Sequence, residues 1–402
     1  MEPEKALEAV KSGATLLLLD VPQYTLIGID TQAFYVGPAF QGIKMIPPGV
    51  HFVFYSSSTR DGKEFSPIIG FFMDAGRSQV VVRRWNPQEE CLLKVSEEEE
   101  ERYSRAVRNL EFDKHLGPYD RSHYADWKRL SNYVTKSTIE RLEPIGGEIT
   151  VTCESGMLKN TRKNAMERAL DEHLRNSKFS TPGEKSQRRG CYYTPIPHVV
   201  KRKGIESGQL TSLNLDKANI NVCFSIQTEL LETLLVKDYG GSEDSLLGEL
   251  QFAFIAFLMG QSLEAFIQWK SLVSLLFGCT EAPFRTRSQL FTKFIKVIYY
   301  QLTYGLQKDS RIVEAGASAV LDDSWFSSDS FLHHLCKDFF SLVQDASVVD
   351  GDLLSWTRKL QELLENRLGW EFQQKSGVDG IYFEEDDEYA PVVEMLDEPS
   401  ES

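Results

Sequence analysis

The first hundred residues alternate between short apolar runs and turn-forming residues. Their apolar runs favour extended backbone, because β-branched and aromatic residues are enriched and Gly, Pro, Asp or Asn bounds each run. Pro47-Pro48-Gly49 predicts a turn between two of them, since two adjacent prolines exclude both a helix and a central strand. We therefore predict a compact β-domain with strands at 14–20, 24–30, 49–57, 67–75, 79–85 and 90–95.

A helical pattern begins at Ser96. Its hydroxyl can cap the helix while Glu99 reaches back, which is a capping-box spacing. The run Glu97–Glu101 places carboxylates at the positive end of the helix dipole. We expect Gly117-Pro118 to end this helix, and a second helix to follow over about 122–136. These two helices close the β-domain.

From residue 228 onward the apolar period becomes helical. The segments are apolar around most of their circumference, which predicts burial between neighbouring helices in an all-α bundle or a short array of stacked hairpins. The hairpin 246–277 resembles one tetratricopeptide unit, but no second copy follows at that period, so core packing is the favoured interpretation. The expected helices cover 230–235, 245–260, 262–277, 289–304, 330–343 and 352–368.

Together these patterns predict a multidomain α+β protein. It has an N-terminal all-β, sandwich-like domain with flanking helices, a C-terminal all-α helical domain and an acidic tail. Between the domains lies a basic, partly flexible linker, in which 159–203 holds twelve bases and four acids. A solvated linker is the favoured interpretation, and an RNA or nuclear-import contact through Lys201-Arg202-Lys203 is the alternative. The expected boundaries are 1–145, 146–227, 228–375 and 376–402.

The net charge changes how the tail is interpreted. The 402-residue chain carries a formal charge of -15 at pH 7, which argues against a protein that grips nucleic-acid phosphates over its whole surface. Residues 376–402 hold ten acids and no Lys or Arg, so the rest of the chain has 49 acids and 44 bases. Within the tail, 390–396 is a β-prone run that could add as a strand to the sheet edge of a partner. An inert tail is the alternative.

The six cysteines favour reduced thiols in an intracellular protein. No two of them are closer than 32 residues, so no CxxC pair indicates a zinc or redox site. The N-terminus lacks the basic flank and apolar core of a signal peptide. The longest apolar run, 252–260, is shorter than the roughly twenty residues that a membrane span needs, so no membrane contact is expected.

The histidines do not form a recognisable metal site. His51 follows a turn on a strand, as in a cupin-type site, but Val53 takes the place of the second imidazole, so we expect a packed or hydrogen-bonded residue. His333 and His334 point roughly 100° apart on a helix and cannot chelate one ion together. The chain has no GxSxG, HExxH, Walker or GxGxxG motif. We therefore predict no catalytic, metal or cofactor-binding residue; a hydrolase or metal enzyme is the least favoured alternative.

Several stretches in both predicted domains resemble those of one family. GIKMIPPGVHF and LGELQFAF are the most specific of them, and they lie in separate domains in the expected order. The chain thus resembles the A1-cistron splicing factor family, as a member from a plant or another eukaryote. A departure is ANINVCFSIQTE at 218–229, where the family pattern runs almost directly onward. The resemblance spans about 13–145 and 228–395 and rests on 28–57, 70–72, 116–119, 247–273, 370–372 and 390–395.

The resemblance implies a non-enzymatic assembly chaperone of the U5 small nuclear ribonucleoprotein (snRNP) in pre-mRNA splicing. Family members bind the large central scaffold protein of that particle, at its RNase-H-like and Jab/MPN-like domains, in the cytoplasm. They exclude its RNA helicase until nuclear maturation. We accordingly expect a monomer in cytoplasm and nucleus, without direct RNA contact as its main task. The implied partner-binding residues, through strand addition, are Val392, Val393, Glu394 and Met395.

Phosphorylation is the expected release signal, because a dianion in an interface adds repulsion and a desolvation cost. Ser242 precedes two acids and Ser288 follows two arginines, while Ser186 is an accessible residue of the linker. These three serines are the candidate phosphosites. The alternative to a splicing role is a helical-repeat adaptor that binds peptides in a groove near Trp269.

Overall fold

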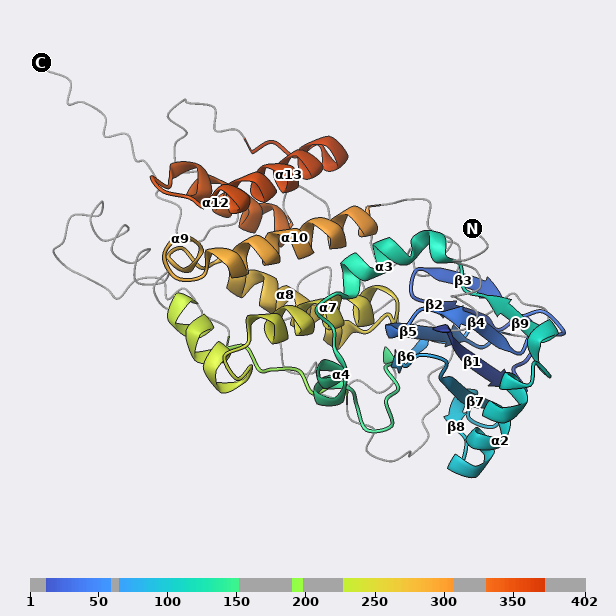
Figure 1. Ribbon diagram of the computed structural model, residues 1–402. Coiled ribbons are helices and arrows are strands. Elements are labelled where there is room, and N and C mark those ends of the chain that lie inside the picture. Colours follow the sequence, from blue (N-terminus) through green and yellow to red (C-terminus); the bar gives the residue numbers. More distant parts are fainter. Residues whose placement is uncertain (1–11, 59–64, 152–189, 198–226, 307–329, 373–402) are drawn as a thin grey trace, which may run out of the picture. The chain divides into compact units, whose positions relative to one another are not determined.

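The computed structural model describes residues 12–58, 65–151, 190–197, 227–306 and 330–372 (Figure 1). The chain divides into two compact units, Met1–Trp370 and Glu371–Ser402, and all the described helices and strands belong to the first. Most of the predicted linker and the whole predicted tail lie outside the described residues. The predicted fold class is confirmed, with an N-terminal β-domain that carries helices and an all-helical C-terminal region.

The described part of the chain has nine strands in two sheets. They are β1 (Ala14–Leu19), β2 (Leu26–Ile29), β3 (Gln32–Tyr35), β4 (Gly42–Ile46), β5 (Gly49–Ser56), β6 (Ile69–Ala75), β7 (Val80–Asn86), β8 (Cys91–Lys94) and β9 (Leu116–Pro118). One sheet has the order β8-β7-β1-β4-β9 and the other β3-β2-β5-β6. The pairs β1–β7 and β4–β9 are parallel, whereas the other pairs are antiparallel.

The helices follow the predicted order. In the β-domain they are α2 (Glu97–Arg108), α3 (Tyr124–Ser131) and α4 (Lys136–Leu142), with short 3-10 turns at Asp113–His115 and Arg121–His123. The C-terminal region begins with a helix at 227–237. It continues with α7 (Glu243–Leu258), α8 (Leu263–Phe277), α9 (Ala282–Arg285), α10 (Ser288–Gly305), α12 (Phe331–Asp345) and α13 (Gly351–Leu368). None of the described helices combines the length and the apolar composition that crossing a bilayer requires.

Both faces of the sheets are covered, which explains why their apolar runs are nearly continuous. Tyr55 of β5 belongs to the core between the two sheets. Val82 of β7 points the other way, into a second cluster beneath α2. On the outer face of the other sheet, Phe72 of β6 stacks on Phe252 of α7 with ring centroids 4.3 Å apart. The β-domain and the helical region therefore share a packed aromatic contact.

The first predicted helix is only partly correct. Ser96 caps it as expected, since its Oγ accepts a hydrogen bond from the Glu99 N–H at 3.3 Å. The Glu99 carboxylate binds mainly the Arg84 guanidinium, at 3.0 Å, because a charge-assisted bond is stronger than one to a neutral amide; the Ser96 backbone N–H makes a smaller contribution to the same carboxylate. The helix ends at Arg108 rather than at Gly117-Pro118. Those two residues instead form β9, whose backbone pairs with β4.

Three more elements differ from the sequence-based expectation. The predicted helix 122–136 stops at Ser131, because Thr135 caps a separate helix, α4, through a capping box. Strands β3 and β4 were not predicted. The residues of β3 are half-buried or exposed at a sheet edge, so its sequence lacks the apolar signal of the other strands. Met45 in β4 has a φ of 63°, a backbone irregularity that a simple alternation does not predict.

Candidate functional site

Two of the three candidate phosphosites lie at helix N-termini. Ser242 is the N-cap of α7, and its side chain accepts a hydrogen bond from the Ser245 N–H at 3.2 Å. Ser288 is the first residue of α10. Local sequence explains the cap at Ser242, since a serine followed by Glu243 and Asp244 satisfies the free amides and places negative charge at the helix start. Ser186 lies outside the described residues, as do Val392, Val393, Glu394 and Met395.

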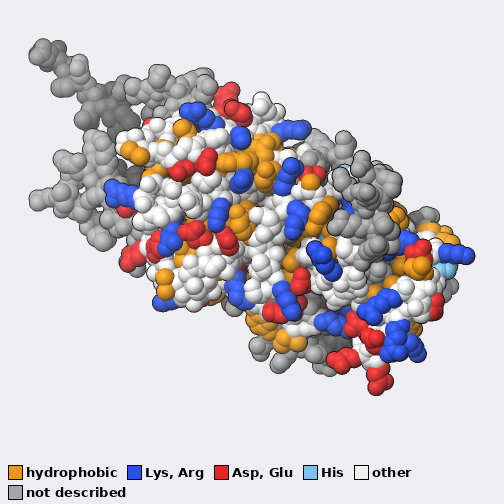
Figure 2. All heavy atoms as spheres, viewed as in Figure 1, with side chains coloured by type: hydrophobic (Ala, Val, Ile, Leu, Met, Phe, Trp, Pro, Cys, Tyr) orange, Lys and Arg blue, Asp and Glu red, His pale blue; other side chains and the backbone are white. Residues whose placement is uncertain are grey.

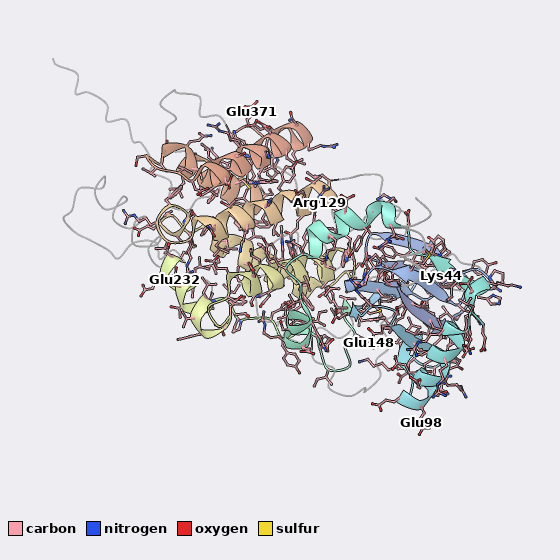
Figure 3. All side chains as sticks on the ribbon, in the orientation of Figure 1. Lys44, Glu98, Arg129, Glu148, Glu232 and Glu371 are labelled. Carbon is pink, nitrogen blue, oxygen red and sulfur yellow. The ribbon has the colours of Figure 1, made fainter. Side chains whose placement is uncertain are left out.

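A network of ion pairs joins these helix starts. Arg287, next to Ser288, binds Glu232 of the helix 227–237 through two bonds of 2.9 and 2.7 Å. Glu232 is labelled in Figure 3. The same guanidinium donates to Glu243 of α7 at 3.0 Å. These carboxylates raise the pKa of Arg287, and the hydrogen bond from Arg287 lowers the pKa of Glu232. Three helices thus meet at a single arginine.

A second ion pair extends this network. The Lys293 ammonium on α10 lies 2.8 Å from Asp244 of α7, and this hydrogen bond raises the pKa of Lys293. Ser242 and Ser288 therefore sit on either side of one cluster of paired charges, although they are far apart in the sequence. A phosphate on Ser242 would add a dianion beside these carboxylates and compete with them for the two cations. The cluster can act as a charge-sensitive junction between α7 and α10.

Sequence reasoning did not identify a second site, centred on the buried Glu249 of α7. Its Oε1 accepts hydrogen bonds from the Thr194 N–H and the Gln268 side chain, both at 2.8 Å. Its Oε2 accepts from the Thr194 hydroxyl and from Arg141 of α4, again at 2.8 Å. One carboxylate thus fixes the segment 190–197 against α4, α7 and α8. The sequence signal that could have revealed this site is a single acidic residue, Glu249, in the middle of an apolar helical run.

Gln251, two residues after Glu249 in α7, holds the end of α3. Its side-chain carbonyl accepts a hydrogen bond from the Tyr133 N–H at 2.8 Å, and its amide donates to the Asn132 side chain at 2.8 Å and to the Arg129 carbonyl at 3.2 Å. A Cβ at Gly248 would lie only 2.6 Å from the Tyr133 carbonyl oxygen. These buried polar contacts attach the closing helix of the β-domain to the helical region.

The histidines that were considered as metal ligands contact neighbouring protein groups. His51 is fully buried in β5, with Nδ1 2.6 Å from Asp30 and Nε2 2.6 Å from the Pro47 carbonyl, so the expected packed and hydrogen-bonded role is confirmed. The rings of His333 and His334 lie edge to face, with centroids 5.8 Å apart and ring planes at 85°. Within the described ranges, no group of three or more His, Cys, Asp or Glu is placed to hold a metal ion.

The structure contradicts the alternative expectation that Trp269 lines a peptide groove. Trp269 is 1% exposed, and its indole N–H donates to Gln301 of α10 at 3.0 Å. Phe254 and Phe266 pack against its ring. The helical hairpin α7–α8 buries this residue because α10 and α12 cover it, so Trp269 belongs to the core.

Comparison with known proteins identifies the family. Residues 12–144 match the family model of the AAR2 N-terminal domain, and residues 193–373 match that of the AAR2 C-terminal repeat region. A protein AAR2 homolog of Caenorhabditis elegans is 30% identical over 92% of this chain and 98% of its own length. The human protein AAR2 homolog is 31% identical, with 99% and 97% covered. The A1 cistron-splicing factor AAR2 of Saccharomyces cerevisiae is 21% identical, with 72% and 76% covered. The predicted resemblance is therefore confirmed, and the chain belongs to the AAR2 family of splicing-related factors.

Proposed function

We propose that this protein is a non-enzymatic assembly chaperone of the U5 snRNP in pre-mRNA splicing. It binds the large scaffold protein of that particle, at its RNase-H-like and Jab/MPN-like domains, and keeps the RNA helicase away until maturation in the nucleus. The observation that supports this most is the family match over both regions of the chain. The buried contacts of Gln251 with the end of α3 add to it, because they hold two regions together as one surface for a large partner.

The tail is proposed to add a strand to the scaffold. Its segment at 390–396 combines β-prone residues with flanking acids, and the acids keep the unbound segment solvated. Strand addition gives affinity through backbone hydrogen bonds, while alternate side chains give specificity. Val392, Val393, Glu394 and Met395 form this strand in the proposal.

Release is proposed to begin at the charged junction of α7 and α10. A phosphate on Ser242 or Ser288 would compete with Glu243 and Asp244 for Arg287 and Lys293. Because those ion pairs join the two helices, their exchange would change the local surface that meets the partner. The bound scaffold would then be released in favour of the helicase.

A binding experiment tests the proposal. The full chain is titrated against the purified scaffold region that contains both named domains, in the presence and absence of the helicase. We expect tight binding that excludes the helicase, and a large loss of affinity on deletion of 376–402. Absence of binding by the full chain would contradict the proposed function. Unchanged affinity and unchanged helicase competition in the deletion variant would contradict only the role of the tail.

The phosphosites are tested with acidic substitutions. Ser242→Glu and Ser288→Glu should weaken scaffold binding, whereas Ser137→Glu, on the exposed start of α4, provides a control with the same charge change. Equal affinities for all three variants would rule out release through this junction. A pull-down with mass spectrometry separates the chaperone from a general peptide-binding adaptor, since only the chaperone recovers U5 components.

A further inference from the structure

A groove of about 360 Å³ lies where α3, α10 and α13 meet. Four of its nine lining residues are aromatic. Tyr299 and Tyr300 of α10 pack against Trp356 of α13, with ring centroids 5.6 and 6.0 Å away and ring planes at 73° and 58°. All three side chains are partly exposed. Figure 2 shows hydrophobic side chains gathered on the surface over α10 and α13, with Lys and Arg side chains beside them.

Two lysines from different helices converge on the same indole. The Nζ atoms of Lys296 on α10 and Lys359 on α13 lie 4.9 and 4.3 Å from the centroid of the Trp356 ring. Both lysines are exposed, and in the described part of the chain neither has a carboxylate within ion-pair distance. Cation–π contacts hold the ammonium groups in place but leave their N–H donors open to an anion. Lys359 lines the groove and Lys296 lies over the same indole beside it, so two uncompensated positive charges stand at the groove.

A third cation completes the rim. Arg129 of α3 lies over the Tyr300 ring at 5.3 Å (Figure 3). It is already paired with Asp126 at 2.9 Å, so its charge is largely balanced. Arg129 thus shapes the groove, whereas Lys296 and Lys359 supply its net charge.

The wall of the groove also contains an unsatisfied polar group. The Tyr304 hydroxyl is buried and has no hydrogen-bond partner among the described residues. Burial raises the pKa of Tyr304, so the phenol remains neutral and can donate. A buried hydroxyl without a partner has lost its bonds to water without replacing them. A ligand oxygen that enters the groove would satisfy it.

We propose that this groove binds an acidic peptide segment in which carboxylates flank an apolar side chain. The apolar side chain rests in the groove against the exposed edges of Tyr299, Tyr300 and Trp356. The flanking carboxylates meet Lys296 and Lys359, and a peptide oxygen accepts the hydrogen bond of Tyr304. Aromatic anchors surrounded by unpaired charges are typical of specific peptide sites. This inference is independent of the proposed U5 scaffold, because it depends on the groove alone.

Single-stranded RNA is the competing ligand class, since aromatic and basic residues together also bind nucleic acids. A base that stacks on Trp356 would have to displace the two ammonium groups that already lie over the ring. A carboxylate, in contrast, uses those groups where they are. The net charge of -15 also opposes a polyanion more than a short peptide with two or three acids. The geometry favours the peptide.

The test uses the full chain as bait for a phage-displayed library of 16-residue segments from disordered protein regions. Parallel baits are the charge-reversed variant Lys296→Glu/Lys359→Glu and a matched control, Lys237→Glu/Lys337→Glu, which changes two exposed lysines outside the groove. The milder variant Lys296→Gln/Lys359→Gln removes the charges without reversing them. Circular dichroism and thermal unfolding check that every variant folds. Enriched peptides are then synthesised and their affinities measured at two salt concentrations.

We expect the full chain and the control to enrich acidic peptides with an apolar centre, and the charge-reversed variant to lose at least about tenfold in affinity for them. The glutamine variant should lie between the two, and higher salt should weaken binding. Hydrogen exchange should slow over 296–304 and 352–359 when peptide is bound. Enrichment that does not depend on Lys296 and Lys359, or no enrichment, would overturn the proposal. Retention of a fluorescent oligouridine through these lysines, without acidic peptides, would overturn it in favour of RNA.

Discussion

The buried pair of His51 and Asp30 gives the sharpest test of how the β-domain is held together. Both side chains are 0% exposed. The Asp30 carboxylate accepts three hydrogen bonds, from His51 at 2.6 Å, from the Tyr119 hydroxyl at 2.6 Å and from the Phe52 N–H at 3.0 Å. The second ring nitrogen of His51 faces the Pro47 carbonyl, which can only accept, so both ring nitrogens face hydrogen-bond acceptors. This geometry predicts that the buried imidazole is an imidazolium.

Asp30→Asn removes the charge that balances this imidazolium. Breaking a buried ion pair by removing one partner costs about 3–5 kcal/mol, because the remaining charge is left uncompensated in a medium of low polarity. The control Tyr119→Phe removes one hydrogen bond to the same carboxylate and should cost less, about 1.5–3 kcal/mol. Both losses in the free energy of unfolding are large enough to measure, because a domain has a total stability of about 5–15 kcal/mol.

The destabilisation caused by Asp30→Asn should depend on pH, and its direction follows from the pKa of His51. Burial lowers the pKa of His51, but the charge and hydrogen bond of Asp30 and the bond to Pro47 raise it more, so the pKa lies above its usual value of 6.5; Lys128 opposes them weakly. A raised folded-state pKa stabilises the fold fully below about pH 6.5, and this contribution disappears as pH rises through the folded-state value. In Asp30→Asn burial prevails and the pKa of His51 falls. The cost of the substitution should therefore shrink as pH rises from 6 to 9.

Native-state hydrogen exchange of the β5 amides measures that cost, because those amides include the Phe52 N–H that Asp30 binds. Nitrogen-15 spectra of His51 report directly whether both ring nitrogens are protonated at pH 7. Three results would refute the reasoning: a neutral imidazole at pH 7, a cost below about 1 kcal/mol, or a cost that does not change with pH.

Three further predictions concern the helical region. Glu249→Gln should weaken the bonds to Arg141 and Thr194 by about 1–3 kcal/mol and open the segment 190–197 to limited proteolysis; an unchanged cleavage pattern would show that the carboxylate does not hold that segment. Gly248→Ala should lower the melting temperature, since its Cβ would meet the Tyr133 carbonyl oxygen at 2.6 Å, whereas Gly351→Ala meets nothing within 4 Å and should be neutral; equal melting temperatures would contradict this. Maleimide at pH 7.5 should spare the buried Cys279, whose pKa is raised to about 12 by burial, and rapid labelling in the native protein would argue against that environment.

Local patterns predicted the elements whose sequence alone determines their form. The hairpin α7–α8 was predictable because thirteen consecutive residues of α7, Leu246–Leu258, are buried, and Ser262 caps the next helix. Ser96 was also recognisable as a cap, because it stands directly before the glutamates of the first helical turn. Strand β9 was not predictable, since its three residues are extended only because β4 lies beside them. The bond between Glu99 and Arg84 likewise depends on where β7 passes.

By itself, the sequence determined the order of a β-rich and a helical region, the family resemblance and the concentration of acid at 376–402. These properties follow from local composition and periodicity, which a chain carries before it folds. Only the tertiary structure brought Ser242 and Ser288 to one ion-pair network and placed Lys296 and Lys359 over one indole. Those arrangements depend on the packing of helices that are distant in sequence. Packing is governed by the shape of whole buried faces. No short stretch of sequence encodes it.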